Sequence, residues 1–537
     1  MQEIQLSLLI FTPLLAAFIG LFIPARSVGV FRYLSLITNA VQLVVLISLL
    51  VSYHPDAGTQ FVEYQPWITI DLGNWGVLKA AYFLGLDGLS LPLVALSVLV
   101  LLIATISSWQ VNRQPKGYFL LILLLNAAIL GSFMALDFLL FYLFFEFMLL
   151  PMFFLIALWG GPRREYASIK FFLYTLVGSI LILVAMIGLY ISTHEPNGTN
   201  QIIHSFNLVS MRDWSHYLPG SILQPGHAWM IGPFNARQWC FLLLFVGFAI
   251  KLPMVPLHTW LPDAHVEAST PVSVLLAALL LKIGGYGLLR IAFPLFPDAA
   301  MTFGSFVGWM GVLSIIYGGL NAMSSKDLKR MIAYSSVSHM GFVLIGMASA
   351  TPEGVTGSIY QMFSHGILSA LLFLLAGVIY DRTHDRSIDH YSGLYKKMPA
   401  FSTFVVIAFF ASMGLPGFAG FIGEILVFLG AFKSNSAGGP LHESLAVVAT
   451  VGLVISAAYF LWTLQRMFFG PFFVKGDVQA DDLVDIQSRE YLVLAPLAVA
   501  ALVFGIVPQP VISIIEPFAK EFTTFLLNAG SSIHSNP

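Results

Sequence analysis

The chain of 537 residues is 58% hydrophobic and only 10% charged, whereas an average soluble domain has roughly 25% charged residues. This composition excludes a water-soluble protein, and the net charge of -2 offers no basic excess for binding nucleic acid. The single cysteine, Cys240, excludes an intrachain disulfide and a four-thiolate iron–sulfur cluster, because either needs more sulfur.

The apolar residues gather into fourteen long runs, which predict an all-α polytopic membrane protein with about 14 transmembrane helices. A β-barrel is excluded, because its strands alternate polar and apolar residues over only about ten positions. A fifteenth stretch, 511–527, contains several charges and predicts an amphipathic tail at the membrane interface. The fourteen runs are 4–23, 31–52, 86–108, 117–136, 138–159, 168–192, 238–257, 270–293, 303–323, 331–350, 356–380, 400–432, 445–469 and 490–508.

The distribution of Lys and Arg predicts how the chain is oriented. Seventeen of the 25 basic residues fall on one side of the predicted spans, six on the other, and Lys251 and Lys282 within them. Because basic loops favour the inner side of a membrane, both termini are predicted to lie outside. The loops 54–82 and 193–237 are predicted to lie outside as well, and the role of 193–237 is left open.

Glu146 lies in the middle of the run 138–159, with apolar or aromatic residues on both sides. An ionised residue at mid-membrane costs about 2.5 to 3.5 kcal/mol on insertion scales, so one without a role should be rare. The alternative is a protonated carboxyl that is hydrogen-bonded to a neighbouring helix. We therefore take Glu146 as a candidate for proton transfer.

Lys251 ends an apolar stretch and is followed by Pro253 and Pro256, each of which lacks a backbone donor. The helix is therefore predicted to break beside Lys251, within the membrane. Broken helices at membrane depth are typical of ion sites in transporters. The alternative is a lysine that merely extends its ammonium group to the interface.

Two further charges are predicted at membrane depth. Lys282 lies near the centre of the run 270–293, and the glycines after it permit close approach of another helix. These glycines follow no strand and complete no dinucleotide fingerprint. Glu424 follows a second interruption, at 414–417, where glycines and a proline break the run. Both residues are candidates for proton transfer.

Histidines accompany these charges. His339 and His365 lie in spans between Lys282 and Glu424 in sequence, and a histidine can accept and release protons near neutral pH. The alternative is a neutral, hydrogen-bonded core histidine. His258 and His265 flank the first proline-rich break and either relay protons or cap helix ends. Their spacing matches no common zinc motif, so no metal site is predicted.

Residues near the ends of predicted spans receive only supporting roles. Asp137 and Arg290 are in this class, because anchoring at the interface explains them better than a role in proton transfer. Lys326, Lys329 and Arg330 are assigned to a loop on the basic side.

Two segments carry a resemblance to a known family. Residues 251–290, KLPMVPLHTWLPDAHVEASTPVSVLLAALLLKIGGYGLLR, and 324–341, SSKDLKRMIAYSSVSHMG, resemble the antiporter-like subunits of respiratory complex I, membrane-bound hydrogenases and multisubunit cation/proton antiporters. The resemblance extends over about 80–510. It implies two inverted five-helix repeats, each with a broken helix. The implied organisation is helices 1 to 3 in 1–116, the repeats in 117–293 and 303–469, and helix 14 with the amphipathic tail in 470–537.

The resemblance also implies roles for individual residues. Glu146 and Lys251 would form an ion pair, Lys282 would be the central lysine, and Glu424 would mark the exit of the second half-channel. His339 and His365 would lie on the polar axis between Lys282 and Glu424. Because the M-type branch of the family carries glutamate where the L and N types carry lysine, Glu424 favours the M type.

The implied function is proton translocation coupled to electron transfer in an NADH:quinone oxidoreductase, with no redox chemistry on this chain. FMN, iron–sulfur clusters and quinone are expected in partner subunits, which would include L- and N-type antiporter-like subunits and small K- and J-type subunits. The expected location is an energy-transducing membrane, most simply the bacterial inner membrane. The alternatives are a subunit of a multisubunit Na+/H+ antiporter or of a proton-pumping membrane-bound hydrogenase.

Overall fold

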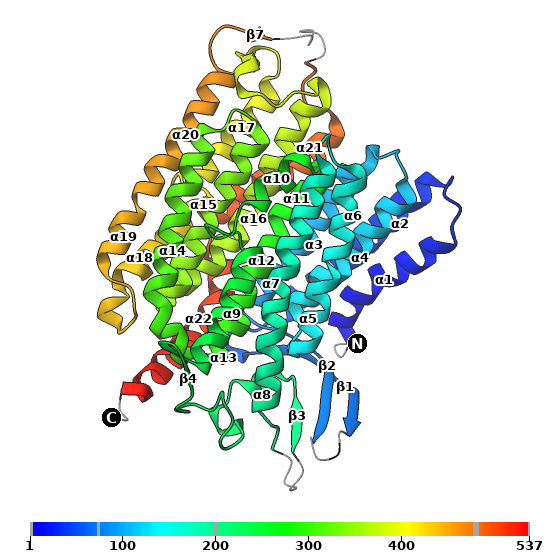
Figure 1. Cartoon of the computed structure of the whole chain (residues 1–537). Helices are drawn as coiled ribbons and strands as arrows, with labels where there is room; N and C mark the ends of the chain where they lie inside the picture. The colour runs from blue at the N-terminus through cyan, green and yellow to red at the C-terminus, as the bar shows by residue number, and fades with distance from the viewer. Residues whose placement is uncertain (1–3, 72, 74–75, 197–201, 476–482, 535–537) are drawn as a thin grey trace.

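The computed structural model describes residues 4–71, 73, 76–196, 202–475 and 483–534, and it shows a bundle of long helices (Figure 1). Within these residues, twelve helical stretches are long and apolar enough to cross a membrane. Each corresponds to one of the uninterrupted runs in the sequence. The stretches are α1 (Gln5–Phe22), α2 (Val28–Ser52), α3 (Ser90–Ser107), α4 (Pro115–Met134), α5 and α6 (Phe138–Phe147 and Leu149–Trp159), α7 (Arg164–Ser192), α11 to α13 (Thr270–Leu295), α14 (Pro297–Ser324), α15 (Leu328–Ala348), α16 (Pro352–Thr383), α19 and α20 (Glu443–Ala449 and Val451–Phe468) and α21 (Ser488–Ile506).

The remaining two runs are interrupted, as predicted. The first contains α9 (Ala236–Lys251) and α10 (Trp260–Glu267), and the second contains α17 (Pro399–Ser412) and α18 (Ala419–Lys433). In the second break Gly414 and Gly417 have φ values of +76° and +96°, which an L-residue with a side chain rarely adopts. One break falls in each predicted repeat. The count of fourteen spans and the inverted relation of the repeats stay predictions.

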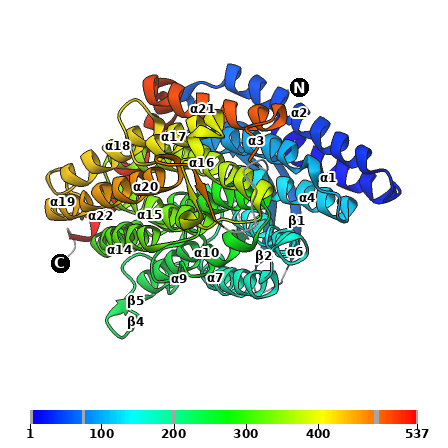
Figure 2. The same ribbon diagram turned by 90° about the horizontal axis from the view of Figure 1, so that it is seen from above.

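The helices at the centre of the bundle are the most completely buried. Seen from above, α15 and α16 lie in the middle, with α1 and α2 at one edge and α19 at the opposite edge (Figure 2). Every residue in the most apolar stretches of α16 and of α11 to α13 is buried. The peripheral helices expose apolar side chains instead, as a surface in contact with lipid or partner subunits does. The candidate residues Lys282, His339 and His365 all lie on the central helices.

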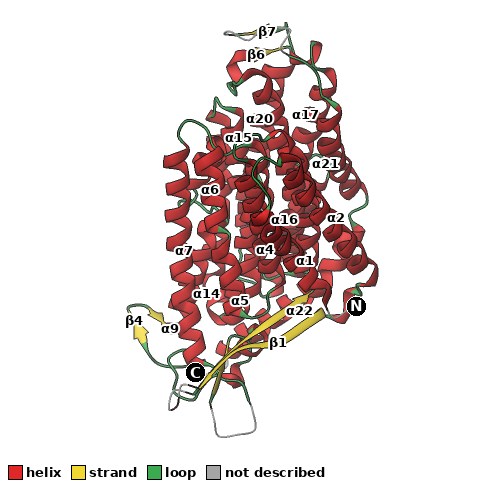
Figure 3. Ribbon diagram, turned by 90° about the vertical axis from the view of Figure 1, so that its right-hand side faces the viewer, coloured by secondary structure: helices red, strands yellow, loops and turns green. Residues whose placement is uncertain are grey.

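The predicted loop 54–82 contains a β-hairpin, which was not predicted from the sequence. Strand β1 (Gln60–Asp71) pairs antiparallel with β2 (Val77–Leu86), with Gln60 opposite Leu86 and Asp71 opposite Val77, and β2 pairs parallel with β3 (Ile203–Ser205). Alternating β-branched and aromatic residues favour strands here. The hairpin lies at the end of the bundle that also holds both termini, the hairpin end (Figures 1 and 3).

The opposite end of the bundle carries a second small sheet. Strands β6 (Tyr391–Ser392) and β7 (Phe473–Val474) pair there, and we refer to this end as the β6–β7 end (Figure 3). At the hairpin end a short helix, α8 (Leu208–Met211), and strands β4 (Met230–Ile231) and β5 (Phe234–Asn235) lie within the loop 193–237.

The predicted amphipathic tail is helical. It forms α22 (Gln509–His534), which packs across α3, α14 and α16 at the hairpin end. Glu521 and Lys520 are exposed on it, whereas Phe522 and Leu526 face the bundle and are buried. The tail therefore covers one end of the bundle in addition to being amphipathic.

Candidate functional site

Lys282 is fully buried in α12 (Leu281–Gly287), with a relative exposure of 0%. Helix α12 lies between two π-helical turns, Leu276–Leu280 and Leu288–Ala292. π-Turns within α-helices occur frequently at functional sites. The Lys282 ammonium group donates a hydrogen bond to the carbonyl oxygen of Ala277 at 2.6 Å, within the first π-turn. The structure thus places this lysine far from either end of its helix.

A direct contact links Lys282 to the second half of the chain. Its Nζ lies 2.7 Å from Nδ1 of His365 on α16. Because an ammonium group only donates, Nδ1 of His365 accepts this hydrogen bond whenever Lys282 holds its proton. The ring of His365 in turn lies 5.4 Å from the ring of His339 on α15, centroid to centroid.

The row continues from His339 to the second broken helix. His339 Nδ1 lies 3.6 Å from Glu424 Oε1 on α18 and 3.4 Å from Gln361 Nε2 on α16. Glu424 is 3% exposed and His339 is 4% exposed. Four of the six candidate residues, on four different helices, therefore form one buried row in the order Lys282, His365, His339, Glu424. The sequence did not predict this order, and it did not predict Gln361 as a member of the site.

The expected ion pair between Glu146 and Lys251 is not closed in this structure. Among the described residues, neither Glu146 Oε1 nor Lys251 Nζ has a hydrogen-bond partner. Lys251, which is 2% exposed, instead places Nζ 3.9 Å from the centroid of the Phe145 ring, a cation–π contact. Glu146 is half-buried on α5, next to the exposed side chain of Phe147. Glu146 is therefore partly accessible from outside the chain, although its Oε1 atom is buried.

Glycine brings the first break against the helix of Lys282. A Cβ atom added to Gly284 would lie 2.6 Å from the backbone nitrogen of Leu252, the residue after Lys251. Real Cβ atoms do not approach backbone this closely, so α12 and the end of α9 can pack in this way only because residue 284 is glycine. The predicted close helix approach is thereby confirmed.

The two histidines at the first break differ in their surroundings. His265 on α10 is fully buried, and its ring stacks on Phe373 with the centroids 4.5 Å apart. Within the described part of the chain, neither of its ring nitrogens has a hydrogen-bond partner. His258 lies in the break itself, with its ring 5.3 Å from that of Tyr317. His265 is therefore the better placed of the two for exchanging protons within the bundle.

Asp137 caps α5 and ties it to the hairpin. Its carboxylate accepts hydrogen bonds from the backbone nitrogens of Leu140, at 3.0 Å, and Ala81 on β2, at 3.1 Å. Burial raises the pKa of Asp137 to about 6, although these hydrogen bonds act in the opposite direction. These contacts favour the anchoring interpretation of this residue.

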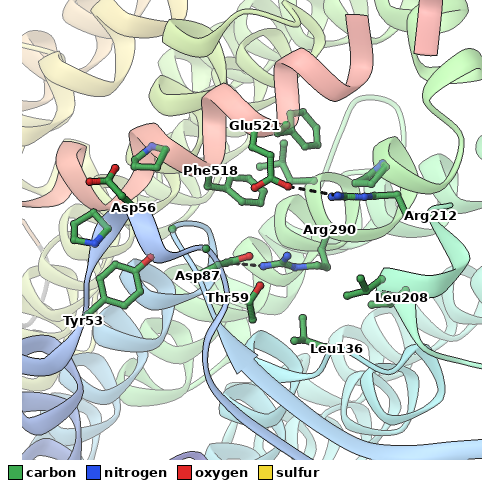
Figure 4. A pocket seen from close by; sticks show the side chains of 18 residues that line it. Tyr53, Asp56, Thr59, Asp87, Leu136, Leu208, Arg212, Arg290, Phe518 and Glu521 are labelled. Carbon is green, nitrogen blue, oxygen red and sulfur yellow. Dashed lines mark hydrogen bonds and ion pairs between the residues drawn. The ribbon is translucent and has the colours of Figure 1, made fainter. Parts of the chain in front are cut away.

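Arg290 lies in the wall of a cavity of about 400 Å³ at the hairpin end (Figure 4). Its Nη2 donates to Asp87 Oδ1 at 2.6 Å, and its Nε donates to the hydroxyl of Tyr286 at 3.2 Å. Burial acts to raise the pKa of Asp87, but the Arg290 guanidinium overcomes this effect and holds the pKa below its usual value. A second pair, Arg212 with Glu521 at 3.4 Å, lies beside the first in the cavity wall. Arg290 thus ties the helix of Lys282 to the turn between β2 and α3.

The sequence pattern assigns Lys329 to a loop, and this assignment is wrong. Lys329 lies in the first turn of α15 and is 2% exposed, whereas Lys326 and Arg330 beside it are exposed. Asp327 caps the helix by accepting a hydrogen bond from the backbone nitrogen of Arg330 at 2.9 Å. The cap fixes where α15 begins and so turns Lys329 into the bundle.

Comparison with known proteins identifies the family. The family described as NADH:quinone oxidoreductase/Mrp antiporter, TM, matches residues 135–450. The chain belongs to this family. NADH-quinone oxidoreductase subunit M of Rhodobacter capsulatus is 41% identical over 518 residues, and the match covers 95% of each chain. The protein of the same name from Rickettsia bellii is 37% identical over 517 residues, which are 95% of this chain and 96% of that one. The expected resemblance to the M-type branch of the family is confirmed.

Solved structures of family members share the fold. A chain of respiratory complex I from Thermus thermophilus with bound NADH superposes with a TM-score of 0.80 at 30% identity, covering 98% of this chain and 100% of that one. A chain of the Mrp complex from Dietzia sp. DQ12-45-1b gives the same TM-score at 19% identity, covering 98% of this chain and 99% of that one. The second likeness concerns the fold alone. Together with the twelve long apolar helices, these matches confirm the predicted class, an all-α polytopic membrane protein.

Proposed function

We propose that this chain is the M-type, proton-translocating membrane subunit of an NADH:quinone oxidoreductase. The observation that carries the proposal is the buried row of Lys282, His365, His339 and Glu424, which joins the two halves of the chain. Each member can bind and release a proton, and ionisable residues at membrane depth typically mark proton or ion pathways. Relatives named NADH-quinone oxidoreductase subunit M support the assignment to this enzyme.

The proton moves along this row by a change of hydrogen-bond partner at each step. Lys282 gives a proton to His365 Nδ1, which lies 2.7 Å away, and His365 releases one toward His339. From His339 the proton passes to the carboxylate of Glu424. Moving one proton against 100 mV costs about 2.3 kcal/mol, which equals a change of roughly 1.7 units in the proton affinity of a site. Modest electrostatic coupling is therefore sufficient to drive each step.

Glu146 and Lys251 control the proton affinity of Lys282. In this structure the Lys251 ammonium lies on the Phe145 ring, apart from Glu146. Closing the ion pair would neutralise the charge of Lys251, and a neutralised neighbour makes it easier for Lys282 to hold a proton. Because Glu146 is only half-buried, charges on a neighbouring subunit can act on it and open or close the pair. His258 and His265 at the break support this exchange.

The transported ion is H+ rather than Na+ in this proposal. Glu424 is the only carboxylate of the row, and the described residues contain no group of three or more His, Cys, Asp or Glu side chains placed to hold a metal ion. Hard cations favour sites with several oxygen ligands. A row of three nitrogen bases and one carboxylate suits protons instead. The Na+/H+ antiporter and hydrogenase alternatives become outcomes of the experiment below.

The proposal also covers the repeats, the orientation, the cofactors and the partners of this chain within the enzyme complex. The two inverted repeats, 117–293 and 303–469, form the two half-channels, and both termini and the hairpin end face the outer side of a bacterial inner membrane. FMN, iron–sulfur clusters and quinone are held by partner subunits. The membrane partners are L- and N-type antiporter-like subunits and small K- and J-type subunits.

The decisive experiment uses the purified complex that contains this chain. Co-purification with flavin and iron–sulfur subunits, together with NADH-driven proton uptake into proteoliposomes, is expected. Replacing Lys282 by Ala should remove proton transport while the complex remains assembled. Purification without redox subunits, or Na+ transport in place of H+ transport, would overturn the proposal in favour of one of the alternatives.

A further inference from the structure

Lys329 is a buried cation that the proposed row of residues does not use. It is 2% exposed, although it lies only one turn from the start of α15 at the β6–β7 end. Its long side chain could have reached solvent, as that of neighbouring Lys326 does. Burying an ammonium group is expensive, so a buried lysine near a helix end has a structural or a chemical reason.

The ammonium group of Lys329 lies at the junction of the first broken helix and the helix of Lys282. Its Nζ donates to the carbonyl oxygen of Ala268 at 2.9 Å and lies 3.5 Å from Ser273 Oγ. Ala268 is the residue that ends α10, and Ser273 lies in α11 (Thr270–Leu275). Ser273 Oγ donates in turn to the carbonyl oxygen of His265 at 3.1 Å. The hydroxyl group of Ser273 thus lies between the ammonium group of Lys329 and the backbone carbonyl of His265.

On the solvent side Lys329 faces mainly carboxylates. The charged groups that act on it are Asp327 at its own helix start, Asp381 on α16, Glu267 on α10, and Arg386 in the loop after α16. Two cavities lie beside these groups at the β6–β7 end. One, of about 290 Å³, is lined by Ser269, Thr270 and the exposed Asp381, and the other, of about 380 Å³, by Glu267, Asp327 and Arg386. Carboxylates that can accept protons therefore line both cavities and act on Lys329.

On the inner side Lys329 is linked to His265 through the hydroxyl group of Ser273. Both Lys329 and Lys282 act electrostatically on His265, and His265 acts on His365. The side chain of His265 is fully buried, and its two ring nitrogens have no hydrogen-bond partner among the residues the structure describes. Buried polar atoms are nearly always bonded, so ring nitrogens without a partner indicate a role such as proton exchange. His265 is therefore the buried group on which both Lys329 and Lys282, the first residue of the row, act.

We propose that Lys329 is the uptake residue through which protons from the β6–β7 end reach the buried row. A proton arriving at Asp381 or Glu267 is taken up by the neutral amine of Lys329, and the ammonium form releases one proton to a ring nitrogen of His265. His265 passes this proton to the neutral amine of Lys282, at the start of the row, and returns to its neutral form. This inference rests on the proposed function, because it assigns the residue that supplies protons to the same row.

The competing explanation is structural, since a positive charge at the end of α10 stabilises the last carbonyl groups of that helix. Arginine separates the two explanations, because guanidinium keeps the charge and the donors but does not release its proton. Lys329→Arg and Lys329→Met are therefore compared with Lys326→Met, which removes the exposed neighbouring lysine. NADH oxidation with an artificial electron acceptor and the amount of assembled complex report on folding, independently of proton transport.

If Lys329 takes up protons, both Lys329 variants assemble and their NADH-driven proton transport falls at least about tenfold, while Lys326→Met transports normally. Normal transport by Lys329→Arg would overturn the inference in favour of the structural role. If a Lys329 variant fails to assemble, Lys329→His decides the matter: because it retains a titratable group, it must restore transport, and failure to do so rejects the inference. Lys282→Ala serves as the reference. If Lys282→Ala also transports protons normally, the proposed function itself is wrong. If the Lys329 variants transport normally and Lys282→Ala does not, only the inference about Lys329 is wrong.

Discussion

Lys282 Nζ and His365 Nδ1 lie 2.7 Å apart, so one hydrogen bond joins the helix of the central lysine to the second half of the chain. Both groups are buried among apolar side chains, where two positive charges in contact would repel strongly. The pair therefore favours holding one proton rather than two. A proton that arrives at Lys282 displaces one from His365, which is the coupling that a directional relay needs.

Replacing His365 by Ala should interrupt the row between Lys282 and His339. We expect NADH-driven proton transport by the purified complex to fall at least about tenfold, because a positioned acid–base group typically contributes this much or more. Proton uptake into proteoliposomes is the measurement. His54→Ala is the matched control, because His54 is exposed and far along the chain from the row. Equal transport by the two variants would contradict the relay.

Replacing Glu146 or Lys251 by Ala should abolish proton transport while an assembled complex remains. Lys251 Nζ is buried without a hydrogen-bond partner among the described residues, so we expect the charge of Glu146, rather than a local hydrogen bond, to set its role. Glu146→Gln, which keeps the shape of the side chain, should behave like Glu146→Ala. Proton transport at the wild-type stoichiometry in both alanine variants would show that this pair does not control the row.

Replacing Gly284 by Leu should destabilise the chain, because even a Cβ atom would lie 2.6 Å from the Leu252 backbone nitrogen. Overpacking of this kind costs about 1 to 3 kcal/mol. The thermal transition of the solubilised complex, compared at one scan rate, should shift to lower temperature. Gly29→Leu is the control, since a Cβ atom added to Gly29 would meet nothing within 4 Å. A similar shift in both variants would mean that the close approach at Gly284 is unimportant.

Replacing Asp87 by Ala should leave the Arg290 guanidinium, whose side chain is only 13% exposed, without its ion-pair partner. Removing one partner of a buried pair costs about 3 to 5 kcal/mol. In the same cavity wall, Glu521 pairs with Arg212, but their side chains are 64% and 41% exposed (Figure 4). Glu521→Ala should therefore cost about 1 kcal/mol or less. Thermal transitions of the two variants, measured side by side, test this difference, and equal shifts would contradict it.

Much of the site was predictable because its signals are local. A run of about twenty apolar residues predicts a span, since a helix of that length crosses the hydrocarbon core. Pro253 and Pro256 cannot continue a helix, and the glycines at 414–417 adopt backbone angles that end one, so both breaks followed from the sequence. Glu146, Lys251, Lys282 and Glu424 stood out because each is a charge within such a run.

Only the tertiary structure shows which residues that are far apart in the chain come close together. It placed His365 between Lys282 and His339, held Lys251 against Phe145 rather than Glu146, and buried Lys329, which in sequence reads as part of a basic loop. It also revealed the strands of 54–82, which hydropathy alone does not separate from a loop. Sequence patterns determine which segments enter the membrane, because the free energy of burying a segment is largely the sum of contributions from its individual residues. Which buried groups touch depends on how whole helices pack, and that is a property of many residues together.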